Sequence, residues 1–222
     1  MAENIKDVRA LRRGLAILDI LARHGPGRLS DVARKAQIPK STTRRMLSAL
    51  ENAGYVRRTL GDDLFRSNIA APGQSVSPPN RSAGRIVHAA RPVLEALSKE
   101  VVWPSDVFVR DGLELQVIET TRPLTPLLVN RNQIGERVDM VTTAVGRAYL
   151  AYCPEAERRE VLQGLGVSRR DLDTLGLAAI IEETRRVGFA VRDPRCTGAT
   201  ELNPHLNDRL YAIAVPVMAA AP

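Results

Sequence analysis

The sequence has few of the residues on which several protein classes depend. Two cysteines, Cys153 and Cys196, are too few for a disulfide framework or a zinc cluster, and they indicate a reducing environment. No uncharged apolar run reaches the roughly 18 residues that a membrane span needs. Charges surround every short apolar group at the N-terminus, unlike in a signal peptide. We therefore expect a cytoplasmic protein that does not associate with membranes.

Motifs of catalysis and metal binding are also missing. The sequence has no Gly-rich phosphate loop, no metal-ligand spacing and no Gly-x-Ser-x-Gly turn. Its three histidines lie in separate segments, and the spacing of Cys153 and His205 gives little support to a cysteine hydrolase. We therefore expect that the protein is not an enzyme and that it binds neither a cofactor nor a metal ion.

Acidic residues are scarce at one end of the chain only. Residues 1–60 contain 13 Lys and Arg but 5 Asp and Glu, a net charge of +8. Residues 61–80 have a net charge of −1, and residues 81–222 are neutral, with 18 charges of each sign. A basic module joined to a neutral one is typical of a polyanion-binding protein that has a second role elsewhere. Charge alone leaves open a protein with a merely basic surface.

The first 67 residues have the pattern of a helix, a helix–turn–helix pair and a β-hairpin. Apolar residues at helical spacing predict a first helix over residues 8–22. Its apolar stripe consists of Val8, Leu11, Leu15, Leu18 and Ala22. A second helix with Ser30 as its N-cap ends near Pro39, and a third begins at Lys40. Two β-prone runs around a Gly-Asp-Asp turn predict the hairpin.

The third helix begins with hydroxyl and guanidinium groups that suit duplex DNA. In a helix–turn–helix, the second helix enters the major groove and the first braces it. Hydroxyl groups at a helix N-terminus suit phosphates, and arginine forks match guanine. Arginines of the hairpin would contact the DNA backbone as a wing. The predicted DNA-contacting residues are Ser30, Lys40, Ser41, Thr42, Arg44, Arg45, Ser48, Arg57, Arg58 and Arg66. A simply solvated basic face is the alternative for these side chains.

A second domain follows a boundary rich in Pro, Ser and Gly at residues 70–80. A helix is predicted over about residues 81–100, with Pro92 indicating a kink or two shorter helices. Beyond Trp103 strands and helices mix, as is typical of an α+β fold. The predicted domains are a winged helix–turn–helix over residues 1–68, a linker with its helix over 69–100, and an α+β domain over 101–222.

Residues 13–58, RGLAILDILARHGPGRLSDVARKAQIPKSTTRRMLSALENAGYVRR, resemble the winged helix of the IclR family of bacterial transcription regulators. The resemblance continues at residues 143–151 (TAVGRAYLA), 188–191 (GFAV) and 213–217 (IAVPV). Residues 102–107 and 151–155 also resemble the branch of the family that activates phenylpropanoid and other aromatic-acid catabolism. Together these segments extend over nearly the whole chain.

The resemblance implies a transcription regulator with a profilin- or GAF-like sensing domain for a small, often carboxylated effector. Each DNA half-site needs one winged helix, so we expect a homodimer, or a homotetramer built as a dimer of dimers, joined through the first helix and the linker. Family members continue past Val-Pro-Val with another strand and a closing helix. The sensing domain is therefore expected to be truncated at its C-terminus. A ligand-sensing adaptor, whose winged helix contacts protein instead of DNA, is the alternative function.

The helix start near Thr143 is the main candidate for the effector site. Small residues and hydroxyls there leave N–H groups that suit a carboxylate. A capped helix that packs closely through Gly146 is the alternative. Cys196 lies in a polar loop at residues 193–208 that could border the pocket. The candidate effector-binding residues are Asp106, Glu119, Thr142, Thr143, Ala144, Val145, Gly146 and Cys196.

Overall fold

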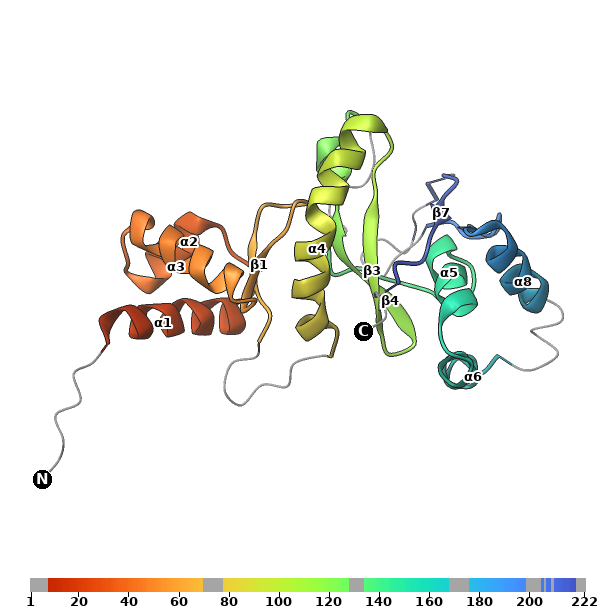
Figure 1. The fold of residues 1–222 in the computed structure, drawn as a ribbon, viewed down its shortest axis with the longest axis horizontal. Helices are drawn as coiled ribbons and strands as arrows, with labels where there is room; N and C mark the ends of the chain where they lie inside the picture. The colour runs from red at the N-terminus through yellow and green to blue at the C-terminus, as the bar shows by residue number, and fades with distance from the viewer. Residues whose placement is uncertain are drawn as a thin grey trace, which may run out of the picture. The chain divides into compact units, whose positions relative to one another are not determined.

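The computed structural model (Figure 1) describes residues 8–69, 78–127, 134–167, 176–198, 205, 207, 208 and 210–218. The chain divides into two compact units. The first comprises Met1–Val107 and Ile118–Ile134, and the second comprises Phe108–Val117 and Gly135–Pro222. Among the described residues, no helix has both the length and the apolar character needed to cross a membrane.

The first unit begins with the predicted winged helix–turn–helix. Its elements are α1 (Arg9–His24), α2 (Leu29–Ala36), α3 (Lys40–Asn52), β1 (Val56–Arg58) and β2 (Phe65–Ser67). The two strands pair antiparallel, with Val56 opposite Ser67 and Arg58 opposite Phe65. The order of helices and hairpin that the sequence predicts is confirmed.

The core of this module corrects the predicted apolar face of α1. Ile17, Leu18 and Leu21 are buried, whereas three members of the predicted stripe are exposed. The exposed members are Val8, Leu11 and Leu15. The sequence of α1 contains two apolar stripes that share Leu18, and periodicity alone does not show which one faces α2 and α3. The remaining core side chains are Val32, Ile38, Leu47, Val56 and Phe65.

The start of α2 differs from the prediction by two residues. Arg28 has extended backbone angles and occupies the N-cap position, and its carbonyl accepts hydrogen bonds from the amides of Asp31 and Val32. The prediction of Ser30 as N-cap is therefore wrong, because Ser30 already lies inside the first turn of α2. Gln37, with a φ of 54°, then turns the chain toward Pro39, the N-cap of α3.

Helix α4 (Pro78–Glu100) also belongs to the first unit and contains Pro92 without splitting in two. Ala83, Val87 and Leu94 are buried, while Val93 and Leu97 are exposed. Residues 70–77, which make up most of the predicted boundary at residues 70–80, lie outside the described residues. A single helix thus replaces the two shorter pieces that Pro92 had suggested.

Strands β3 (Asp106–Asp111) and β4 (Glu114–Thr120) contribute residues to both units. They form a sheet in the order β3–β4–β5, in which β4 pairs antiparallel with β5 (Arg137–Val138) and Leu115 lies opposite Val138. A short 3₁₀ helix, η1 (Arg122–Leu124), follows β4. The other elements are α5 (Ala144–Tyr152), α6 (Glu155–Gly164), α8 (Leu177–Val187), β6 (Ala190–Val191) and β7 (Ile213–Ala214).

The second unit has an α+β fold, as the sequence predicts, but residues 101–107 and 118–134 of the predicted domain belong to the first unit. Helix α5 packs against α8, and β6 pairs antiparallel with β7. Its core consists of Leu115, Met140, Leu150, Val161 and Leu177. The large side chains of β7 and its flanks remain exposed, among them Tyr211, Ile213 and Val215.

Candidate functional site

The exposed face of α3 carries five of the predicted DNA-contacting side chains. They are Lys40, Ser41, Arg44, Arg45 and Ser48. Thr42 is half-buried, and Thr43 and Leu47 are buried on the opposite side. Within the part of the chain that the structure describes, Arg44 and Arg45 form no ion pair. Their guanidinium groups are therefore available to an external anion.

A side-chain bond fixes the start of α3. The buried hydroxyl of Thr43 donates to the carbonyl oxygens of Ile38, at 3.3 Å, and Pro39, at 3.2 Å. These bonds tie the first turn of α3 to the tight turn that follows α2. Ser30 is exposed in the first turn of α2, so the structure places it on the bracing helix of the same motif.

The structure buries Arg57, which the sequence placed among the DNA contacts. Its side chain donates from Nη1 to Oδ1 of Asn68 at 2.5 Å, and Asn68 in turn donates from Nδ2 to the carbonyl of Gly54. Burial lowers the pKa of Arg57 to about 10. This burial corrects the prediction that Arg57 reaches DNA from the surface of the hairpin.

The other two arginines of the hairpin face aspartates. Arg66 forms a forked ion pair with Asp62, with distances of 2.9 Å and 2.5 Å, and its side chain is mostly buried. Arg58 pairs with Asp63 at 2.5 Å and lies over the ring of Phe65, 5.5 Å from its centroid. The charges of Arg58 and Arg66 are thus largely neutralised within the hairpin, whereas Arg44 and Arg45 of α3 have no ion-pair partner among the described residues.

Asp106 and Glu119 belong to the first unit, whereas the Thr142–Gly146 candidates belong to the second. Asp106 forms an ion pair with Arg122 at 2.7 Å and accepts a bond from the Thr120 hydroxyl at 2.6 Å. Glu119 is fully buried and its carboxylate accepts bonds from backbone amides. Both carboxylates therefore already have partners in the structure.

The start of α5 is capped as one of the two alternatives predicts. The Thr143 hydroxyl accepts a bond from the Gly146 amide at 3.0 Å and donates to the carbonyl of Asp139 at 2.6 Å. The Asp139 carboxylate accepts from the amides of Val141 and Thr142, at 2.8 Å and 2.6 Å. A Cβ on Gly146 would lie 2.4 Å from the carbonyl oxygen of Met140, so this approach requires glycine. Ala144 and Val145, which follow Thr143, complete the turn.

A buried ion pair beside this turn was missed by the sequence reading. Nη2 of Arg147 forms an ion pair with Oδ2 of Asp193, with both side chains at most 7% exposed. Arg147 also donates to the carbonyls of Val141, at 2.9 Å, and Val191, at 3.3 Å. The signal available in the sequence was an arginine inside an otherwise apolar helix, because a buried charge requires a partner.

Cys196 lies shortly after Asp193 in the chain. Its amide donates to the carbonyl of Asp193 at 3.0 Å, and its thiol is free and partly buried. Most of the loop after residue 198 lies outside the described residues. Among those that are described, no group of three His, Cys, Asp or Glu side chains could hold a metal ion.

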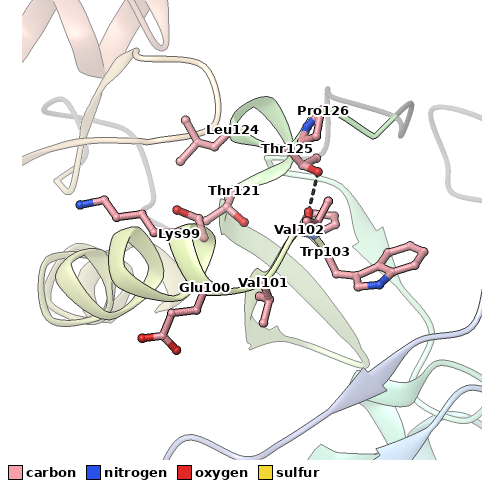
Figure 2. Close-up of a pocket in the computed structure, with 11 residues that line it drawn as sticks. Lys99, Glu100, Val101, Val102, Trp103, Thr121, Leu124, Thr125 and Pro126 are labelled. Atoms are coloured by element: carbon pink, nitrogen blue, oxygen red, sulfur yellow. Dashed lines mark hydrogen bonds between the residues drawn. The ribbon is translucent and has the colours of Figure 1, made fainter.

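A small hollow in the first unit lies between the end of α4 and η1 (Figure 2). Its volume of about 110 Å³ is below the roughly 300–1,000 Å³ typical of small-molecule sites. Figure 2 shows the bond across it, from the Thr125 hydroxyl to the Val102 carbonyl at 2.6 Å, and the exposed Trp103 at its edge. The hollow therefore does not have the size of an effector site.

Two family models match consecutive parts of the chain. The IclR helix-turn-helix domain matches residues 10–60, and the bacterial transcriptional regulator IclR C-terminal domain matches residues 82–220. An uncharacterized HTH-type transcriptional regulator of Haemophilus influenzae is 32% identical and aligns with 93% of this chain and 81% of its own. The transcriptional repressor IclR of Escherichia coli is 27% identical over 89% of this chain and 76% of its own.

The chain also aligns with the solved structure of an IclR homologue from Microbacterium hydrocarbonoxydans in complex with 4-hydroxybenzoate. It is 21% identical, with a TM-score of 0.48, and the match covers 95% of this chain and 83% of that one. An IclR family regulator from Brucella abortus, also 21% identical, has a TM-score of 0.46 and covers 98% and 79% of the two chains.

Proposed function

The chain belongs to the IclR family of bacterial transcriptional regulators, and on that premise we propose that α3 reads an operator in double-stranded DNA under the control of a small effector. The observation that carries the proposal is the exposed face of α3, where Lys40, Arg44 and Arg45 stand opposite the buried Thr43 and Leu47. A helix held in this way presents cations to a groove without unfolding its own core.

The side chains of α3 divide into two roles in this proposal. Ser41 and Thr42, in the first turn, suit phosphate oxygens together with the helix N-terminus. Arg44 and Arg45 suit the O6 and N7 acceptors of guanine in the major groove. Ser30, on α2, and Arg58, half-exposed on the hairpin, would contact the backbone on either side.

Salt dependence tests DNA binding directly. An operator duplex is first selected from a random pool with the full chain, and Kd is then measured by fluorescence anisotropy between 50 and 200 mM KCl. Four phosphate contacts would weaken binding by about a hundredfold over that range, because binding releases condensed counterions. An adaptor whose winged helix contacts protein would retain no duplex from the pool, and this result would favour the alternative function.

The proposed regulator binds as a homodimer or a dimer of dimers. Two half-sites require two recognition helices. The exposed apolar residues Val8, Leu11 and Leu15 of α1 lie at helical spacing and suit a symmetric contact, as do Val93 and Leu97 of α4. We place the protein in the cytoplasm, where its DNA lies, and assign it no catalytic activity.

The effector in this proposal is a small aromatic or other carboxylic acid. The support is the start of α5, where small residues and hydroxyls surround helix amides, and the resemblance of residues 102–107 and 151–155 to the regulators of aromatic-acid catabolism. Thr142–Gly146 and Cys196 are its proposed contacts.

Replacing Thr143 by valine separates this site from a purely structural cap. Loss of the hydroxyl cap is expected to lower the free energy of unfolding by about 1 kcal/mol. Isothermal calorimetry with a panel of aromatic acids is expected to show weaker binding to the variant than to the wild type. Equal affinities, with the stability lowered, would leave Thr143 with its capping role only.

A further inference from the structure

The hairpin turn between β1 and β2, residues 59–64, is bound by a carboxylate that lies 59 residues further along the chain. Glu119 of β4 is fully buried, and both of its oxygens accept a bond from the Leu60 amide, at 2.9 Å and 2.8 Å. Oε1 also accepts from the amides of Gly61, at 3.2 Å, and Thr120, at 2.9 Å. All of these residues belong to the first unit.

The close approach of the turn to β4 depends on Gly61. A Cβ at this position would lie 2.5 Å from Cγ2 of Thr120 and 2.8 Å from Cδ1 of Ile134. These distances are shorter than van der Waals contact allows, so any larger residue would push the turn away from the Glu119 carboxylate. The glycine is required for space, because its φ is not in the left-handed region.

Further hydrogen bonds hold the rest of the turn. The hydroxyl of Thr59 donates to Oδ1 of Asp62 at 2.7 Å, and the Leu64 amide donates to the same oxygen at 3.1 Å. Arg91 of α4 also donates to the carbonyl of Arg58, at 3.2 Å, beside the turn. A stiff turn transmits a restraint at Leu60 and Gly61 to the whole hairpin, and through it to the packed helices.

Burying the Glu119 carboxylate completely costs free energy of folding, because the charged form loses its hydration. Burial raises the pKa of Glu119, and the three backbone amides oppose that rise by stabilising the charged form. An apolar side chain at this position would fill the space without that cost, so stability alone does not account for the carboxylate. What the carboxylate provides is a directed bond to one turn.

We propose that Glu119 is a positioning residue that holds the hairpin turn on β4 and thereby sets the orientation in which α3 is presented to DNA. The proposal rests on the proposed DNA-binding function. The first residues of β4, Glu114–Val117, belong to the second unit, and Glu119, the anchor of the turn, lies in the part of the same strand that belongs to the first unit. A helix–turn–helix held in one orientation loses less freedom on binding an operator than one that moves freely.

Amide hydrogen exchange of the full chain, followed by NMR, tests the anchor without DNA. Glu119→Ala is expected to raise the exchange rate of the Leu60 and Gly61 amides by about tenfold or more, as expected for loss of a charge-assisted hydrogen bond. Exchange within α3 is expected to stay unchanged. Glu119→Gln keeps one acceptor oxygen and is expected to restore part of the protection. Glu114→Gln, on the same strand but half-exposed, is the matched control and is expected to leave the exchange of the Leu60 and Gly61 amides unchanged.

Operator affinity tests the positioning role. Glu119→Ala is expected to weaken binding to the selected operator by about tenfold, with the order of preference among operator sequences retained. Unchanged amide protection, or lost protection with unchanged affinity, would overturn the proposal. If Glu119→Ala does not fold, Gly61→Ala opens the same contact from the hairpin side, and Thr120→Ser, which removes Cγ2, is expected to restore part of the protection in that background.

The two measurements distinguish failure of the anchor from failure of the function. A wild-type chain that retains no duplex would remove the DNA-binding function and the positioning role with it. In that case the exchange experiment would still report whether Glu119 binds the turn.

Discussion

A variant with Arg44 and Arg45 both replaced by alanine is expected to lose most of its affinity for the operator. Both guanidinium groups are exposed on α3 and make no ion pair within the described ranges, so the substitutions break no ion pair there. Each arginine that reads a guanine contributes about 1–3 kcal/mol. The pair should therefore raise Kd by roughly a hundredfold or more, measured by fluorescence anisotropy at constant salt. The thermal midpoint is expected to stay the same.

The matched control removes the same charge from the other unit. Arg159 and Arg186 lie on exposed surfaces of α6 and α8, and Arg159→Ala with Arg186→Ala also lowers the net charge by two. Equal losses of affinity in the two double variants would show a general electrostatic effect and would exclude base-specific contacts by Arg44 and Arg45. Arg45→Lys, which keeps the charge and removes the fork, further separates base reading from phosphate contact.

Replacing Asp193 by alanine is expected to lower the free energy of unfolding of the second unit by about 3–5 kcal/mol. The substitution leaves the Arg147 guanidinium buried without its carboxylate, and Arg147 also holds the carbonyls of Val141 and Val191. Urea unfolding followed by circular dichroism measures the loss. Because Arg147 lies beside the start of α5, effector binding is expected to fall in the same variant.

Two controls test whether the loss of stability comes from the unpaired charge of Arg147. Glu183→Ala breaks an exposed pair with Arg186 and is expected to leave the unfolding midpoint nearly unchanged. Combining Arg147→Met with Asp193→Leu replaces both charges by apolar groups and is expected to be less destabilising than Asp193→Ala alone. If the double variant is less stable than Asp193→Ala, the Arg147–Asp193 ion pair contributes more to the free energy of unfolding than one buried, unpaired charge costs.

The same pair gives the second unit a defined acid sensitivity. Hydrogen bonds from Arg195 and the charge of Arg147 hold the pKa of Asp193 below its ordinary value of 3.8. A carboxyl group whose pKa is lower in the folded than in the unfolded protein stabilises the fold. This stabilisation is complete above the pKa of the unfolded state and is lost as the pH falls through the pKa of the folded state. Wild-type stability is therefore expected to fall below about pH 4, with a smaller slope in Asp193→Asn.

The winged helix–turn–helix was predictable because its signals are local. Pro39, Gly54 and the apolar spacing of α3 lie within a few residues of the structure that they determine. The Thr143 cap is equally local, since its partner is three residues away.

The features that the sequence reading missed depend on distant partners. Nothing near Arg57 in the sequence distinguishes it from the other hairpin arginines, yet in the structure it is buried and bound to Asn68. The sequence places Glu119 among the possible polar groups of an effector pocket, and nothing near it in the sequence indicates that the amides of Leu60 and Gly61 are its partners. The two apolar stripes of α1 share Leu18, and only packing against α2 and α3 decides between them.

Trp103 is the only tryptophan of the chain, and it stands 63% exposed at the end of α4. Excitation of indole therefore reports from one location in the first unit, without labelling. A shift in its emission spectrum during a titration would reveal whether a bound acid changes the surroundings of that helix end. The wild-type protein thus carries its own optical probe for the response to a ligand.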